Sequence, residues 1–200
     1  ACVGPDYQPG HAHADTLSFE LSVSGQRVVV NGGTSEYTNG PVRASQRSTE
    51  AHNTVTIDKE DSSEVWHSFR VARRAYPQGL QIYNKIDHVG INCSHNGYRW
   101  CPTQPVHSRN WYFSDSSLTI EDTVTGKCKE AVSRFILHPD VEFLDKIEAG
   151  WVLGCANGKN IKFEVMVGTA SIAKTNYACE FGKVIPTRCV LIELVNNKSM

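Results

Sequence analysis

Two histidines and one acid stand at alternate positions near the start of the chain, as His11, His13 and Asp15. Imidazole and carboxylate groups bind metal ions and transfer protons near neutral pH, so this spacing can carry chemistry. Alternate side chains on extended backbone point to the same side of a strand. We therefore expect these three residues to share one face, with an alternating apolar row over residues 17–23 continuing the strand. The competing interpretation is a pair of loop histidines that precede a strand.

The totals limit the class of protein. The chain has 200 residues, with 20 basic and 21 acidic side chains and a formal net charge of -1. This balance argues against nucleic acid as the main partner, because nucleic-acid-binding proteins usually carry a basic surplus. No apolar run is long enough to predict a membrane span. The first residue is Ala1, so we expect a processed product or a fragment. No linker is visible, which predicts a single domain over residues 1–200.

The cysteines do not form a metal-binding pattern. The chain has seven, and no two of them stand in a Cys-x-x-Cys pair, which argues against a zinc ribbon. We expect most of them to be small buried hydrophobic residues. A disulfide between Cys93 and Cys101 stays open, so the cysteines do not decide the redox compartment.

Short alternating apolar runs recur along the whole chain with turn residues between them. Clear examples are residues 27–30, 54–57, 132–137 and 161–167. This pattern predicts an all-β fold, a large antiparallel β-sandwich of two packed sheets with little or no helix. Residues 34–50 are polar and irregular, and they predict a long loop of the kind that is often functional.

Other histidines offer further candidates. His52 comes just before a strand, and we expect His107 and Arg109 to form a structural pair on one strand face. For the remaining histidines we expect a solvent or capping role; these are His67, His88, His95 and His138.

A zinc site needs three or four nitrogen, sulfur or oxygen ligands, often from strands far apart in the sequence. His13 and His52 are the first candidates. Asp15 or Asn31, which ends the strand over residues 28–30, could supply a third ligand.

Several blocks of the chain together resemble the heparinase II/III-like family of polysaccharide lyases. The first is Gly-His-Ala-His-Ala-Asp-Thr-Leu-Ser-Phe over residues 10–19. The second is Val-Val-Val-Asn-Gly-Gly-Thr over residues 28–34, followed by Tyr37. The third joins Arg-Ser-Thr at 47–49 to His-Asn-Thr-Val at 52–55. Weaker matches continue in the same order, so that the resemblance covers most of residues 4–145.

The resemblance implies a two-part enzyme with the substrate between its parts. An N-terminal helical toroid supplies the catalytic tyrosine and lies outside this chain, which resembles the C-terminal β-sandwich. The family pattern implies that His11 is a catalytic histidine facing the cleft. It also implies a structural zinc ion on His13, position 31 and His52. An aspartate is usual at position 31, whereas this chain has Asn31. Loss of a negative ligand is expected to weaken zinc binding.

The implied reaction is β-elimination of a glycan that contains uronic acid. A base removes the C5 proton, an acid protonates the leaving oxygen at C4, and donors neutralise the C6 carboxylate. We expect His11 to act near the scissile bond, and Tyr37, Arg43 and Arg47 to bind carboxylate or sulfate groups of an acidic polysaccharide. The resemblance also implies a periplasmic or extracellular location in a bacterium. Two alternatives stay open: a non-catalytic carbohydrate-binding or scaffold module, and a lyase-like protein of surface-polysaccharide biosynthesis.

Overall fold

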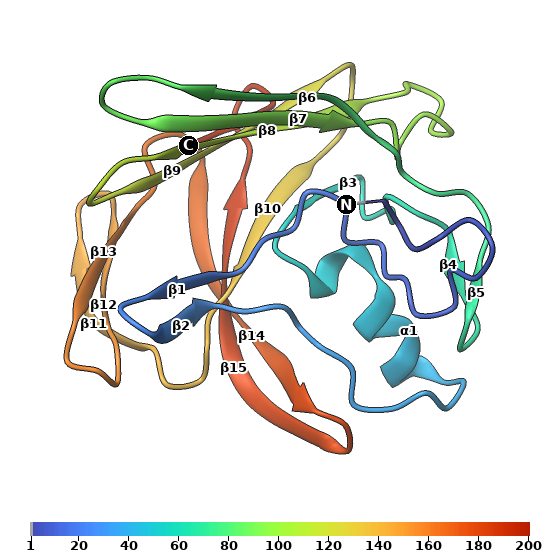
Figure 1. Ribbon diagram of the computed structural model, residues 1–200, viewed down its shortest axis with the longest axis horizontal. Helices are drawn as coiled ribbons and strands as arrows, with labels where there is room; N and C mark the ends of the chain where they lie inside the picture. Colours follow the sequence, from blue (N-terminus) through green and yellow to red (C-terminus); the bar gives the residue numbers. More distant parts are fainter. Residues whose placement is uncertain (1) are drawn as a thin grey trace.

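The alternating runs form strands throughout the computed structural model, which describes residues 2–200 (Figure 1). The predicted all-β class is therefore confirmed. The first half contains β1 (Leu21–Val23), β2 (Gln26–Val29), β3 (Val55–Ile57), β4 (Val65–Trp66), β5 (Arg70–Val71), β6 (Pro77–Asn84), β7 (Val89–His95) and β8 (Val106–Phe113). The second half contains β9 (Leu118–Thr125), β10 (Ala131–Ile136), β11 (Glu142–Ile147), β12 (Gly150–Gly154), β13 (Asn160–Glu164), β14 (Thr169–Glu180), β15 (Lys183–Glu193) and β16 (Lys198–Ser199).

These strands form two larger sheets and three smaller ones, and every pair of neighbouring strands within a sheet is antiparallel. A five-stranded sheet has the order β16-β9-β8-β7-β6, and a four-stranded sheet has the order β14-β15-β10-β3. A three-stranded sheet, β11-β12-β13, lies at one side. In Figure 1 the five-stranded sheet crosses the top and β10, β14 and β15 run down the centre.

The core lies between these sheets. Val55 and Ile57 of β3 pack with Val124 of β9, which joins the four-stranded sheet to the five-stranded one. A second cluster brings Val28 of β2 and Leu153 of β12 against the four-stranded sheet. Because apolar burial is the main stabilising term of folding, these contacts hold the layers together. They leave the connection from residue 9 to residue 20 and the segment from residue 31 to residue 52 to build one edge of the molecule.

A buried charged network connects the two larger sheets. The Asp122 carboxylate accepts hydrogen bonds from His107 Nε2 at 2.7 Å, from Arg109 Nε at 2.7 Å and from Ser133 Oγ at 2.7 Å. All four side chains are fully buried. Arg109 Nη1 also donates to the Leu17 carbonyl at 3.0 Å, so the network reaches the segment that carries His13. The predicted structural role of His107 and Arg109 agrees with these contacts.

His95 differs from its predicted surface role. It lies at the end of β7 and is fully buried. Its Nε2 lies 3.1 Å from Nδ1 of His107. Its Nδ1 accepts the Gly97 N–H at 3.1 Å. The turn residues that follow it in the sequence suggested exposure, but strand β8 covers the ring.

The segment around His11 and His13 is not a strand, so the expectation of a shared strand face is wrong. Ala12 N donates to the Pro9 carbonyl at 2.9 Å, which closes a turn through Gly10 and His11. Leu17 has φ of 64°, a left-handed value that no strand residue adopts. The strand begins only at Leu21. The interpretation of two loop histidines therefore describes this backbone better.

The predicted long loop contains helical turns. Pro41 begins α1 (Pro41–Arg47), and a 3-10 turn, η1 (Thr49–Ala51), follows it. Proline is favoured at the first turn of a helix because it has no N–H to satisfy there. The prediction of a loop is therefore wrong over residues 41–51, although residues 34–40 are irregular.

The seven cysteines carry no disulfide. Cys93 and Cys101 are both free and buried, and they belong to different apolar clusters. Among the described residues, no helix has the length and apolar character needed to cross a membrane.

Candidate functional site

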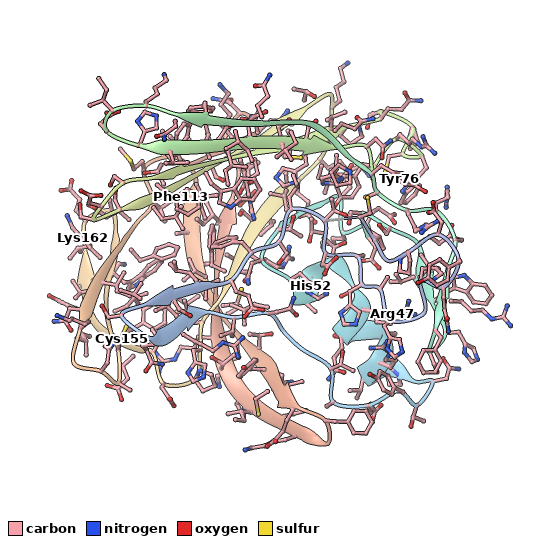
Figure 2. The ribbon with its side chains drawn as sticks, viewed as in Figure 1. Arg47, His52, Tyr76, Phe113, Cys155 and Lys162 are labelled. Atoms are coloured by element: carbon pink, nitrogen blue, oxygen red, sulfur yellow. The ribbon has the colours of Figure 1, made fainter. Side chains whose placement is uncertain are left out.

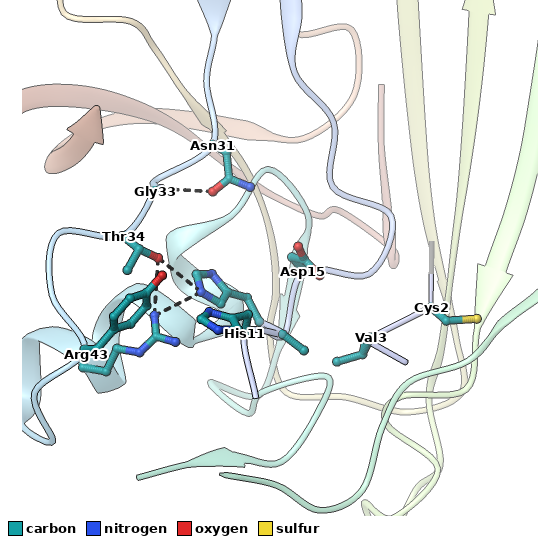
Figure 3. A pocket seen from close by; sticks show the side chains of 12 residues that line it. Cys2, Val3, His11, Asp15, Asn31, Gly33, Thr34 and Arg43 are labelled. Atoms are coloured by element: carbon teal, nitrogen blue, oxygen red, sulfur yellow. Dashed lines mark hydrogen bonds between the residues drawn. The ribbon is translucent and has the colours of Figure 1, made fainter. Parts of the chain in front are cut away.

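A cavity of about 380 Å³ opens where the turn at residues 10–13, the end of β2 and helix α1 meet (Figure 3). The predicted site residues that line it are His11, His13, Asn31, Tyr37 and Arg43, together with Asp15. A second hollow of about 270 Å³ also contacts Asp15 and Asn31 and extends to Phe19 and Glu20. The structure thus brings five of the seven predicted site residues to one cavity wall.

Glycine in the loop that follows β2 makes this wall possible. Gly33 has φ of 78°, and a Cβ there would lie 2.0 Å from the Ala178 carbonyl oxygen. Only glycine tolerates both conditions. The neighbouring Gly32 carbonyl accepts Ala178 N–H at 2.8 Å, which anchors the cavity loop to β14.

His13 and His52 form a contact at the base of the cavity. His13 Nδ1 lies 3.3 Å from His52 Nε2, although the two residues are far apart in the sequence. His13 is partly buried, and His52 is completely buried beside α1 (Figure 2). The prediction that these two side chains meet therefore agrees with the structure.

The hydrogen-bond partners determine how this pair is protonated. Arg43 Nη1 lies 3.2 Å from His13 Nε2, and an arginine can only donate. Nε2 must then be the acceptor, and the neutral His13 ring carries its proton on Nδ1, toward His52. His52 in turn accepts at Nε2 and carries its proton on Nδ1, an atom that is buried without a hydrogen-bond partner in the described chain.

Electrostatics keep both rings neutral. Burial, with the charges of Arg43 and Arg47, lowers the pKa of His13 to about 4. Burial and the neighbouring His13 lower the pKa of His52 to about 3. Both imidazoles are therefore uncharged at neutral pH.

The residues present do not fit a complete zinc site. Two imidazole nitrogens bound to one tetrahedral zinc ion would lie about 3.3 Å apart, which His13 and His52 satisfy. Zinc on His13 Nδ1, however, would move the ring proton to Nε2, against the Arg43 N–H. Within residues 2–200, no group of three His, Cys, Asp or Glu side chains converges as a metal site would require.

Neither candidate for the third ligand changes this conclusion. The Asn31 Oδ1 already accepts Gly33 N–H at 3.0 Å and carries no negative charge. Asp15 lines the cavity wall, and burial raises its pKa. The described residues thus supply two candidate ligands but no third. The structural zinc ion remains a prediction that rests on the family resemblance alone.

His11 stands at the exposed mouth of the cavity among aromatic rings. Its ring centroid lies 5.3 Å from that of Tyr37 and 5.6 Å from that of Phe69, both in edge-to-face geometry. The Tyr37 ring also covers Arg43, whose Cζ lies 5.1 Å from the ring centroid. His11 is thus held by ring contacts while its exposed edge faces the solvent.

The two predicted arginines are buried rather than exposed on a loop. Arg43 lines the cavity but is only 1% exposed, and its Nε donates to the Ser68 carbonyl at 3.1 Å. Arg47 is also 1% exposed, and it donates to the carbonyls of Ala12, Trp66 and His67. The guanidinium of Arg47 therefore ties α1 to the His13 segment and is not available to a ligand in the cavity.

Arg43 places a buried positive charge in the cavity wall, called here the positive wall, and Arg47 lies behind it. Among the described residues, neither Arg43 nor Arg47 forms an ion pair, because their partners are carbonyl, hydroxyl and imidazole groups. Burial lowers the pKa of Arg47 to about 10, and burial also lowers the pKa of Arg43. Both remain charged at neutral pH. Arg43 is the arginine that lines the cavity, where Asp15 is the acidic lining residue, and Arg47 lies behind the wall.

The sequence does not predict two aromatic residues that contact His11 or Tyr37. Phe69 lies in the turn between β4 and β5, and Phe181 lies in the turn between β14 and β15. Phe181 contacts Tyr37, with ring centroids 5.2 Å apart. Exposed phenylalanines in turns are not typical, but the sequence does not show which distant ring they approach.

Comparison with known proteins assigns the family and supports the fold. The chain belongs to the heparinase II/III-like C-terminal family, whose family model matches residues 1–199. A comparison with curated proteins finds no match.

Solved structures of lyases share the fold. The heparan sulfate lyase HepC from Pedobacter heparinus superposes with a TM-score of 0.70 at 17% sequence identity, over 92% of this chain and 28% of that one. The heparinase III BT4657 gene product gives a TM-score of 0.73 at 18% identity, over 94% of this chain and 30% of that one. The chain therefore spans less than a third of the length of these solved proteins.

Proposed function

We propose that this chain is the β-domain of a polysaccharide lyase that cleaves uronic-acid-containing glycans by β-elimination. Family membership and the shared fold support a lyase domain. The observation that carries the proposal is the positive wall of the cavity beside His11. The buried Arg43 cation lines the cavity without an ion-pair partner among the described residues, and it favours an anionic ligand because opposite charges interact strongly where water is excluded.

Arg43 acts on such a ligand mainly through its charge. Its side chain is too buried for a direct bidentate grip in this structure, and Tyr37 lies over it. The cation nevertheless lies in the wall and stabilises a carboxylate placed in the cavity. Tyr37 is 39% exposed and can donate a hydrogen bond from its hydroxyl group to the same ligand. Arg47 supports this wall by holding α1 against Ala12.

The reaction requires a proton acceptor at C5 and a proton donor at O4. The C5–H and C4–O4 bonds break, the C4–C5 double bond forms, and the leaving oxygen takes up a proton. Neutralising the C6 carboxylate makes the C5 proton more acidic, which lowers the barrier. We assign this neutralisation, or proton transfer as a secondary acid or base, to His11. No step is assigned to a metal ion.

The remaining parts of the proposal concern partners and location. The partner is an acidic polysaccharide, held between this domain and an N-terminal helical domain of the same parent protein. The parent protein acts in the periplasm or outside the cell of a bacterium. The coverage of about 30% of the solved lyases supports a missing second part. The 200-residue chain alone is expected to bind the glycan without cleaving it.

A substitution in the full-length parent protein tests the role of His11. Replacement by alanine is expected to lower formation of unsaturated product, followed by its ultraviolet absorbance, by about 100-fold or more. The matched control is His88→Ala in the connection between β6 and β7, outside the cavity. Equal activity of the His11→Ala variant and the control would remove His11 from the mechanism.

The alternative function is a carbohydrate-binding module without catalysis. The partial coverage of the solved lyases supports it equally, because half of a cleft can bind without reacting. Activity of the full-length parent decides between the two. Specific binding with no unsaturated product from the parent would favour the module.

A further inference from the structure

Four rings form a continuous chain on the exposed surface at the mouth of the cavity. Phe69 contacts His11 and Tyr37, and Tyr37 contacts Phe181, with centroid separations from 5.2 to 5.6 Å. Phe69 is 46% exposed, Tyr37 is 39% exposed and Phe181 is 64% exposed. Large apolar rings in mutual contact and in water mark a binding surface more often than a structural one.

The fold holds this ring surface in place by main-chain contacts rather than by burial. Gly182 N donates to the Ser35 carbonyl at 2.8 Å, which fastens the tip of the β14–β15 hairpin to the loop that carries Tyr37. Gly182 has φ of 78°, as a tight reversal after Phe181 requires. The hairpin therefore presents Phe181 to Tyr37 from a distant part of the sequence while leaving most of the ring in solvent.

The surroundings of the rings indicate the chemistry of the ligand. The Arg43 cation lies under Tyr37, and at the β4–β5 hairpin Arg70 lies over the exposed ring of Trp66, with its Cζ 5.0 Å from the ring centroid. Aromatic faces carry partial negative charge and attract the partly positive C–H face of a pyranose ring. Cations beside such faces suit a sugar that also carries an acidic group. An apolar protein segment would use the rings but not the cations.

We propose that Phe69, Tyr37 and Phe181 form a sugar-stacking platform that binds a pyranose ring of an acidic glycan next to the cavity. This inference rests on the proposed function, because it assumes that an acidic glycan enters the cavity beside His11. It adds Phe69 and Phe181 as substrate-binding residues. It also gives the β14–β15 hairpin a role in deciding how many sugar rings the domain holds.

Phe181 is the residue that tests the platform most directly. It is mostly exposed, and replacement by leucine keeps an apolar side chain but removes the ring, so folding is expected to survive. Loss of one stacking contact weakens binding by about 3- to 10-fold. Phe181→Tyr keeps the ring and is expected to bind like the wild type. Phe113→Leu on β8 is the control for loss of an exposed phenylalanine elsewhere.

The experiment titrates the 200-residue chain with a size-defined heparan sulfate octasaccharide by calorimetry. A weaker Kd for Phe181→Leu, with Phe181→Tyr and Phe113→Leu unchanged, supports the platform. If Phe181→Leu binds like the wild type while Arg43→Met binds more weakly, the platform is rejected and the proposed function survives. In that case the rings serve a protein contact, such as the rest of the parent chain. If the folded wild type binds no octasaccharide at millimolar concentration, both ideas fail for this chain.

Discussion

His13 and His52 place two imidazole nitrogens 3.3 Å apart at the base of the cavity, with Arg43 on the far side of the His13 ring. The spacing suits either a direct hydrogen bond or two ligands of one zinc ion. The arginine decides between these possibilities, because it takes the Nε2 lone pair and leaves the ring proton on Nδ1. The pair is therefore a hydrogen-bonded unit in this chain, and a metal would have to displace that arrangement.

Zinc binding is expected to need two changes. The wild type should bind less than one zinc ion per chain, because position 31 lacks a carboxylate and Arg43 opposes metal on His13. The double variant Asn31→Asp with Arg43→Met restores a negative ligand and frees Nε2 to hold the ring proton. Its zinc affinity should rise by at least about tenfold, measured by competition with a chromophoric chelator. The control carries Asn31→Ala with Arg43→Met and should show no gain. Full zinc occupancy of the purified wild type would contradict this account.

The charge of Arg43 should control affinity for acidic glycans. Arg43→Met is expected to weaken binding of a heparan sulfate oligosaccharide to the chain by about tenfold at low salt. The difference should shrink as ionic strength rises, since salt screens the charge. Arg43→Lys keeps the charge and should lose less. Calorimetric titrations at two salt concentrations measure both effects, and an unchanged Kd for Arg43→Met at low salt would show that the Arg43 charge does not act on the glycan.

The sequence predicts the class of fold but not the depth of the arginines. Alternating runs such as residues 132–137 carry the strand signal locally, so the all-β prediction is confirmed, as is the family. The burial of Arg43 and Arg47 depends on carbonyl groups at residues 12 and 66–68, which only the tertiary fold brings near α1. A helix of seven residues also gives a weak local pattern.

Contacts between distant parts of the sequence show the same limit. His13 and His52 could be paired because the family pattern places both in one site. Phe181 has no such guide, since its contact with Tyr37 depends on the length and curvature of the β14–β15 hairpin. The turn after His95 predicts an exposed side chain, whereas its partner His107 comes from the next strand and buries the ring.

Buried histidines should make stability fall as the pH decreases below about 6.5. The Gly97 N–H, the His95–His107 contact and Asp122 fix one neutral tautomer for each ring, and a second proton on His95 would face the Gly97 N–H. Burial, with the charges of His107 and Arg109, lowers the pKa of His95 well below its usual value. The unfolded chain therefore binds more protons below pH 6.5, and protonation favours unfolding.

Replacing His95 by glutamine removes one group that takes up a proton when the chain unfolds below pH 6.5. Between pH 5 and 6, the free energy of unfolding should depend on pH less steeply than in the wild type, by about 1 kcal/mol per pH unit. Urea denaturation at several pH values measures this slope. Val28→Ala, a buried substitution without an ionisable group, should lower stability equally at each pH. A His95→Gln slope equal to that of the wild type would mean that the buried ring is already protonated in the folded protein.

Asp122 is expected to be the most sensitive single charge in the fold. Burial alone would raise its pKa, but Arg109 and His107 outweigh burial and hold the pKa of this carboxyl well below its usual value. The stabilisation is therefore present above about pH 4 and is lost as the pH falls below that value.

Asp122→Asn leaves the Arg109 cation buried without a counterion, which should lower the free energy of unfolding by about 3–5 kcal/mol. The neighbouring half-buried Glu121→Gln on β9 is the control and should change it by less than about 1 kcal/mol. Urea denaturation at pH 7 compares the two variants, and equal losses would show that Arg109 finds enough support in its carbonyl and hydroxyl partners alone.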